Sequence, residues 1–297
     1  MPSVKIATTV AFMLRALLLP GIFFVGGVAL AAPECGKLST RAGNVGYCIA
    51  RTDGDNPDVL YYFHGSTFTM KDVREPERLF PSYLDEHWRN LHRSPPSVIT
   101  VSWGDRWVLK DEKLTAFQME IIPALEDKLP HVAGRRRLIL GTSMGGLSAF
   151  IAWAHLPQLF NAVAFQCPAF TQASPVASRL VKKRLARQWP GNLRDNLSAL
   201  NLLSEIFRPS FSSSEEWLRY QPPRVMGALA GQALPPAYLV FNTKDPFGLN
   251  GAPEIGAAGH QIIYERVAGS HCEGVFTAGL ANFLSDRSIG VSATKKP

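Results

Sequence analysis

Gly141-Thr142-Ser143-Met144-Gly145-Gly146 is the stretch that decides the fold. The strand-like segment Arg137–Leu140 precedes it, and the helix-like segment Gly146–His155 follows. A serine flanked by glycines at such a junction is typical of a nucleophile elbow, a strand-to-helix turn too sharp for large neighbouring side chains. The turn leaves the serine hydroxyl exposed above the sheet. The motif therefore predicts Ser143 as a nucleophile, against the alternative of an ordinary turn serine.

The partners of this serine are expected later in the chain. A serine hydroxyl becomes a good nucleophile only when a histidine, oriented by a carboxylate, takes its proton. Asp245 follows the strand-like segment Ala237–Asn242, and His271 follows the next one, Ile262–Val267. Both lie at the carboxyl ends of strands, in the Ser, Asp, His order of the α/β-hydrolase fold. The remaining histidines except His64 lie on predicted helices, ahead of a strand or in a loop before the elbow: His87, His92, His131, His155 and His260.

An oxyanion hole is expected beside the nucleophile. His64-Gly65-Ser66 ends the strand-like segment Val59–Phe63, at the edge of the sheet where developing negative charge needs hydrogen-bond donors. The predicted donors are the backbone N–H groups of Ser66 and Met144. His64 is expected to shape this loop without acting as an acid or a base.

Strand-like and helix-like segments alternate along most of the chain, which predicts a mostly parallel sheet covered by helices on both faces. The other expected strands are Val45–Ala50, Val98–Trp103 and Ala162–Gln166, and the other expected helices are Ser82–His92, Lys113–Leu129 and Val275–Leu284. Residues 171–236 interrupt the alternation and are expected to form a helical, lid-like insertion before the acid-bearing strand. The expected catalytic domain is 32–289, and 290–297 is expected to be a disordered tail.

Residues 1–31 have the profile of a signal peptide. Lys5 and Arg15 precede an apolar run that begins at Ala16 and is closed by Ala29-Leu30-Ala31. The segment contains no acidic residue. Cleavage is expected after Ala31 or Ala32, giving a periplasmic or secreted protein without a stable membrane anchor. The alternative is an uncleaved anchor helix.

The formal net charge of +7 becomes +5 once Lys5 and Arg15 are removed, which is too mild to indicate a nucleic-acid partner. One basic cluster stands out: Arg179, Lys182, Lys183, Arg184 and Arg187. It indicates either an acidic partner or, more simply, a solvated helix face. No metal-ligand spacing, P-loop or phosphate-binding glycine pattern occurs, so neither a metal nor a cofactor is expected.

An exported chain is expected to pair its cysteines, Cys35, Cys48, Cys167 and Cys272. Four cysteines allow three connectivities, and the sequence does not choose among them. The pairing favoured here joins Cys35 to Cys48 and Cys167 to Cys272. The second bond would hold the loop that carries His271, called the histidine loop below. Two free buried cysteines are the alternative.

Two aromatic residues follow an expected strand end, Trp103 and Trp107. They are expected either to stack on a substrate group or to pack within the protein.

The elbow, together with Tyr62-Phe63-His64-Gly65, resembles the esterase D-like branch of the α/β-hydrolases. That branch includes feruloyl and acetyl-xylan esterases, enterochelin esterases, S-formylglutathione hydrolases and mycolyltransferases. The resemblance implies an eight-stranded sheet and ester hydrolysis through an acyl-enzyme intermediate. One subgroup, secreted feruloyl esterases and tannases, places a cysteine before the serine and another after the histidine; Cys272 matches the second, and Thr142 stands at the first.

The sequence therefore predicts an exported serine esterase acting on a small-molecule or polymer-linked ester. One alternative keeps the same triad but transfers the acyl group to an alcohol or cleaves a polyester. Another is a catalytically inactive binding protein of the same fold, because fold does not determine function.

Overall fold

The computed structural model describes residues 30–66, 82–131, 133–189, 191–247 and 261–289. These residues build one eight-stranded sheet in the order β1-β2-β4-β3-β5-β6-β7-β8. The strands are β1 (Glu34–Thr40), β2 (Gly43–Ala50), β3 (Val59–Phe63), β4 (Ser97–Ser102), β5 (Arg137–Thr142), β6 (Ala162–Gln166), β7 (Ala237–Asn242) and β8 (Ile262–Val267). The β1–β2 and β2–β4 pairs are antiparallel, and every pair from β4 to β8 is parallel. This confirms the predicted α/β-hydrolase sheet.

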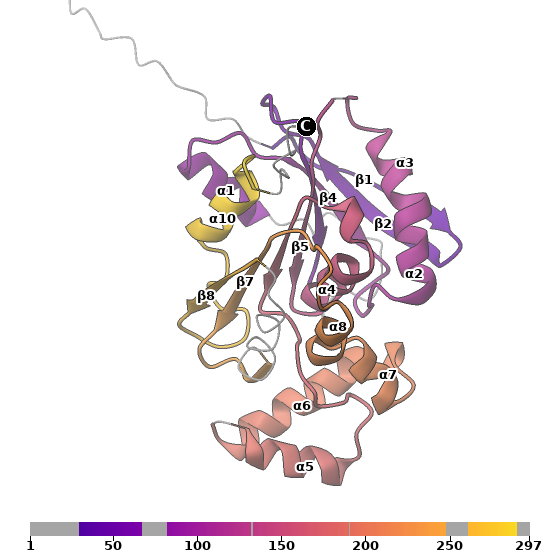
Figure 1. Ribbon diagram of the computed structural model, residues 1–297, viewed down its shortest axis with the longest axis vertical. Helices are drawn as coiled ribbons and strands as arrows, with labels where there is room; N and C mark the ends of the chain where they lie inside the picture. Colours follow the sequence, from indigo (N-terminus) through magenta and orange to yellow (C-terminus); the bar gives the residue numbers. More distant parts are fainter. Residues whose placement is uncertain (1–29, 67–81, 132, 190, 248–260, 290–297) are drawn as a thin grey trace, which may run out of the picture.

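Helices cover both faces of the sheet (Figure 1). One face carries α1 (Ser82–Asn90) and α10 (Ala278–Ser285), and the other carries α2 (Asp111–Ala116), α3 (Ile122–Glu126) and α4 (Met144–His155). The central strands are apolar at successive positions because each face needs its own core. On β3, for example, Tyr61 and Phe63 belong to one hydrophobic cluster, whereas Leu60 and Tyr62 belong to the other.

Several predicted helix boundaries differ from the structure. The helix expected at Lys113–Leu129 is divided by a π-helical turn at Phe117–Ile121. Pro123 explains the turn, because proline has no N–H to donate and its ring crowds the carbonyl four residues earlier. Helix α4 begins at Met144, two residues before the predicted start. Helix α10 begins at Ala278 because the Thr277 hydroxyl accepts the Leu280 N–H and caps it there, later than the predicted start.

Among the described residues of the segment 171–236, between β6 and β7, four α-helices form. They are α5 (Arg179–Gln188), α6 (Leu193–Phe207), α7 (Ser214–Arg219) and α8 (Pro222–Ala228). Figure 1 shows them gathered at one end of the molecule, with α5 and α6 outermost. The basic cluster noted in the sequence lies on α5, where all of its members but the half-buried Lys182 are exposed.

Three observations concern the predicted export: which terminal residues the structure describes, the length and apolarity of its helices, and a disulfide near the described N-terminal end. Residues 1–29 of the predicted signal peptide and the predicted tail, 290–297, lie outside the described residues. Among the described helices, none combines the length and apolarity that a membrane crossing requires. A disulfide joins Cys35 of β1 to Cys48, its cross-strand neighbour on β2.

Candidate active site

Ser143 stands in the sharp turn between β5 and α4. Its backbone has φ 51° and ψ −111°, an unusual conformation for a residue with a side chain. The neighbouring glycines are required by close backbone approach: a Cβ on Gly141 would lie 2.1 Å from the Gly145 carbonyl oxygen, and one on Gly145 would lie 2.0 Å from that of Phe63. The turn thus presents the Ser143 hydroxyl at the carboxyl end of β5.

The structure brings Ser143, His271 and Asp245 into one chain of contacts. Ser143 Oγ lies 2.9 Å from His271 Nε2, and His271 Nδ1 lies 2.7 Å from Asp245 Oδ2. Asp245 is fully buried, and its second oxygen accepts the Phe247 N–H at 2.9 Å. With the carboxylate accepting the Nδ1 proton, Nε2 is left free to take the proton of the serine.

Further contacts join the loop that carries Asp245 to the loop that carries His271. The Asn242 side-chain amide donates to the Glu273 carbonyl at 2.6 Å, and the Lys244 N–H donates to the Gly269 carbonyl at 3.1 Å. The Phe247 ring packs edge-on against the His271 imidazole, with centroids 5.2 Å apart. No sequence pattern indicated Asn242 or Phe247, because their roles depend on how two loops meet in space.

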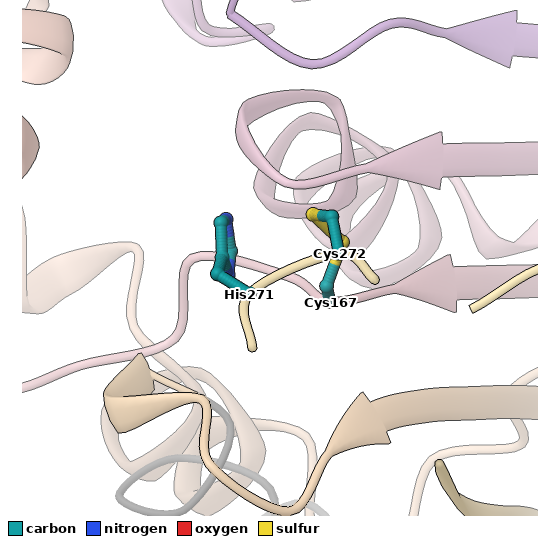
Figure 2. A group of neighbouring side chains, drawn as sticks. All are labelled: Cys167, His271 and Cys272. Atoms are coloured by element: carbon teal, nitrogen blue, oxygen red, sulfur yellow. A yellow bond between two sulfur atoms is a disulfide. The ribbon is translucent and has the colours of Figure 1, made fainter. Parts of the chain in front are cut away.

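A second disulfide, Cys167–Cys272, joins the end of β6 to the histidine loop (Figure 2). It is the second bond of the pairing favoured from the sequence. Figure 2 shows it directly beside His271. The two sulfurs and a His271 nitrogen lie within 4.8 Å of one another, a spacing suited to a metal ion. Sulfurs bonded to each other are not thiolates, however, and His271 already contacts Ser143 and Asp245, so we assign no metal to this group.

Removing this disulfide by Cys167→Ala/Cys272→Ala is expected to lower the free energy of unfolding by about 2–4 kcal/mol, because the bond closes a long loop. It is also expected to lower kcat about tenfold or more, since the histidine loop loses its attachment to β6. Denaturant unfolding and ester kinetics measure both.

The matched control is Cys35→Ala/Cys48→Ala, which removes the disulfide of the β1–β2 hairpin. It should lower stability by a smaller amount, because this bond closes a much shorter loop, and leave kcat unchanged. Equal kcat values for the two double variants would contradict a positioning role for Cys167–Cys272.

The predicted oxyanion donors flank the nucleophile. Gly65 and Ser66 line the same cavity as Ser143, and a Cβ on Gly65 would lie 3.5 Å from the Ser143 Cβ. Met144 is the first residue of α4, so its N–H has no acceptor within the helix and lies at the positive end of the helix dipole. Both backbone segments are therefore near the position where an ester carbonyl oxygen would sit.

His64 is buried, with 3% of its surface exposed, and its ring supports this loop. Trp107 Nε1 lies 3.0 Å from His64 Nε2, and an indole N–H can only donate, so Nε2 accepts. The proton is then on Nδ1, which donates to the Gly65 carbonyl at 2.6 Å. Burial lowers the pKa of His64 to about 4, which keeps the ring neutral in this role at neutral pH.

The hydrogen bond from Trp107 to His64 also bears on whether the two tryptophans stack on a substrate or pack within the protein. Trp107 is 1% exposed, and Trp103 packs against it with ring centroids 5.2 Å apart. Neither is among the described residues that line the cavity at Ser143. Both tryptophans pack against each other within the protein, as the second of the two expectations states.

The buried His64 predicts a loss of stability in mild acid. The unfolded imidazole gains a proton near pH 6.5 and the folded one only near pH 4, so the unfolded state binds more protons between these values. His64 therefore contributes stability that is present above pH 6.5 and falls by about 3 kcal/mol as the pH decreases to 4. Urea unfolding across this range should show a shallower pH dependence for His64→Gln than for the wild type. The exposed His131→Gln is the control, and an unchanged slope in His64→Gln would contradict the assignment.

A cavity of about 270 Å³ opens over Ser143 and His271. One of its walls is a row of apolar side chains on α6: Leu202, Leu203, Ile206 and Phe207. Apolar walls of this kind bind hydrocarbon groups by removing them from water. The helical spacing of these residues was visible in the sequence, but nothing there placed them over the serine.

The matches to known proteins agree with this geometry. The family model described as "Putative esterase" matches residues 46–224, from β2 to α8, including the elbow at Ser143. The chain belongs to this esterase family. Among curated proteins, none matches the sequence of this esterase. Membership of this family makes it a carboxylic-ester hydrolase.

Solved esterase structures share the fold of this esterase at low sequence identity. Brefeldin A esterase, a bacterial homologue of human hormone-sensitive lipase, is 19% identical over 87% of this chain and 78% of its own, with a TM-score of 0.60. Carboxyl esterase 2 from the mycorrhizal fungus Tuber melanosporum is 19% identical over 94% of this chain and 89% of its own, with a TM-score of 0.57. A ferulic acid esterase is 16% identical over 85% of this chain and 96% of its own, with a TM-score of 0.55.

Proposed function

We propose that this esterase is an exported enzyme that hydrolyses carboxylic esters through an acyl-enzyme on Ser143. The observation that carries the mechanism is the unbroken contact chain from Ser143 through His271 to the buried Asp245. A buried carboxylate fixes the imidazole tautomer, and the serine then has a base within hydrogen-bond reach.

Acylation begins when Ser143 Oγ attacks the ester carbonyl carbon while His271 Nε2 takes the hydroxyl proton. The carbonyl oxygen becomes an oxyanion, which the Ser66 and Met144 N–H groups stabilise. Asp245 stabilises the imidazolium formed at His271. The carbon–oxygen bond to the alcohol then breaks, and His271 gives its proton to the departing alkoxide.

Deacylation repeats these steps with water. His271 removes a proton from a water molecule, whose oxygen attacks the acyl carbon, and the oxyanion forms in the same place. Collapse of this intermediate breaks the bond to Ser143 Oγ, which regains its proton from His271. The products are one carboxylic acid and one alcohol. The α6 wall of the cavity favours an apolar acyl group.

Covalent capture tests this mechanism. Incubation with a fluorophosphonate, followed by proteolysis and mass spectrometry, should place one adduct on Ser143. A stopped-flow burst of p-nitrophenol from p-nitrophenyl butyrate should equal the enzyme concentration if deacylation is the slower step. A folded protein that shows neither label nor turnover would instead support the non-catalytic binding protein.

Export is supported by the signal-like start of the sequence and by two disulfides, which persist in oxidising compartments. N-terminal analysis of the protein recovered from its host should find a chain that begins at Ala32 or Pro33, in the periplasm or the medium. Full-length protein in the cytosol would contradict this part of the proposal.

A further inference from the structure

A second cavity, of about 520 Å³, adjoins the one at Ser143. The two share three lining residues, Leu202, Phe247 and His271. Ser143 is among the described residues that line the first cavity and is not among those that line the second. His271 is therefore the triad member that faces both spaces.

The second cavity differs from the first in chemistry. Its rim carries polar side chains from three segments: Asn192 and Asp195 near the start of α6, Thr243 and Lys244 after β7, and Ser270 after β8. Apolar residues line it as well, among them Ala199 and Leu202 of α6, but the described lining of the first cavity includes no Asp or Lys side chain. A substrate that occupies both would thus have an apolar part and a polar part.

The chemistry of the reaction indicates which cavity holds the acyl group of the ester and which holds the alcohol. The alkoxide that leaves during acylation must lie next to the imidazole that protonates it, whereas the acyl group stays on Ser143. The cavity that contains His271 without Ser143 is therefore on the alcohol side of the ester. We propose that it binds the alcohol portion of the substrate, and that this alcohol is neutral and carries several hydroxyl groups, as a glycerol or sugar unit does. The inference rests on the proposed function.

The lining favours hydroxyl groups for a simple reason. Lys244 can only donate hydrogen bonds and the Asp195 carboxylate can only accept them, whereas a hydroxyl does both. The two charges are opposite, so a charged alcohol would be attracted by one and repelled by the other. An apolar alcohol would displace water from these groups without replacing its hydrogen bonds.

Two of these residues are held in place by other contacts. Asp195 is bonded to Asn192 through its side chain, and its N–H donates to the Asn192 side-chain oxygen at 2.9 Å. The backbone of Lys244 is fixed by its bond to the Gly269 carbonyl of the histidine loop. The Asp195 carboxylate, held in this way, loses less freedom when a ligand binds, and the Lys244 bond fixes the position from which its side chain extends.

The test compares two esters with the same acyl group, glyceryl monobutyrate and ethyl butyrate. The kcat/KM value reports steps up to acylation, when the alcohol is still attached, and the ratio of the two values cancels any general loss of rate. The wild type is expected to prefer the glyceryl ester. Asp195→Ala and Lys244→Ala should each lower the ratio about three- to tenfold, as expected for one lost hydrogen bond. Lys183→Ala, on the exposed face of α5, is the control, and circular dichroism checks that each variant is folded.

The outcomes separate this inference from the proposed function. A wild type that hydrolyses both esters with equal kcat/KM, or folded Asp195→Ala and Lys244→Ala variants with an unchanged ratio, would overturn the alcohol site and leave the esterase mechanism intact. Failure of the wild type to form an acyl-enzyme from either ester would overturn the proposed function and this inference with it.

Discussion

Replacing Ser143 with alanine is expected to lower kcat by about four orders of magnitude or more, to the small rate that binding and an oxyanion hole alone provide. The reason is chemical: without the hydroxyl no acyl-enzyme forms, and His271 has no proton to take from the side chain at position 143. Initial rates on p-nitrophenyl butyrate, with burst analysis, measure the loss. The fluorophosphonate adduct should disappear in the same variant.

The matched control for this experiment is Ser214→Ala, which removes an exposed hydroxyl at the start of α7. Its rates should equal those of the wild type. Wild-type turnover by purified Ser143→Ala would show that another group carries the reaction, and the triad assignment would fail.

The second large effect is expected at Gly145. Its alanine variant would place a Cβ 2.0 Å from the Phe63 carbonyl oxygen and 2.6 Å from that of His64. Both atoms are backbone at the end of β3, so a side-chain rotation cannot relieve the clash. Gly145→Ala is expected to lower the free energy of unfolding by about 3 kcal/mol or more and to disturb the loop that carries Ser66. Denaturant unfolding and ester kinetics measure both effects.

Gly227→Ala is the control, and it is expected to raise the free energy of unfolding. A Cβ at this exposed position of α8 would meet nothing within 4 Å. Alanine restricts the unfolded chain more than glycine does, so the variant should gain about 0.4–1 kcal/mol. A Gly145→Ala protein as stable as Gly227→Ala would rule out a steric requirement at the elbow.

The sheet was predictable because its central strands are buried on both faces. A strand such as Val59–Phe63 must be apolar at every position, and its bounds in the structure match the predicted ones. Helix boundaries were less predictable, because they depend on local contacts. The cap at Thr277 and the effect of Pro123 on the preceding turn are visible only once the backbone is placed.

Part of the candidate site could also be predicted from the sequence, and part could not. Ser143, Asp245 and His271 could be proposed because each follows a strand and parallel strands bring their carboxyl ends to one edge. The apolar wall could not, because the sequence does not say how far residues 171–236 fold back toward the elbow. Trp107 shows the same limit: its position after a strand end suggested a substrate contact, whereas its indole bonds to the buried His64.

One helix, α6, supplies a row of four apolar side chains to the cavity at Ser143, while Ser143, Asp245 and His271 lie on segments that follow β5, β7 and β8. Acyl selectivity and chemistry are thereby encoded largely in separate stretches of the gene, whereas the proposed alcohol site uses the loops that carry Asp245 and His271. Substitutions at Leu202, Leu203, Ile206 and Phe207 are expected to change the substrate preference, Leu202 through both cavities, and to leave Ser143, Asp245 and His271 in place. A small combinatorial library at these four codons is therefore an economical starting point for evolving new substrate ranges from this scaffold.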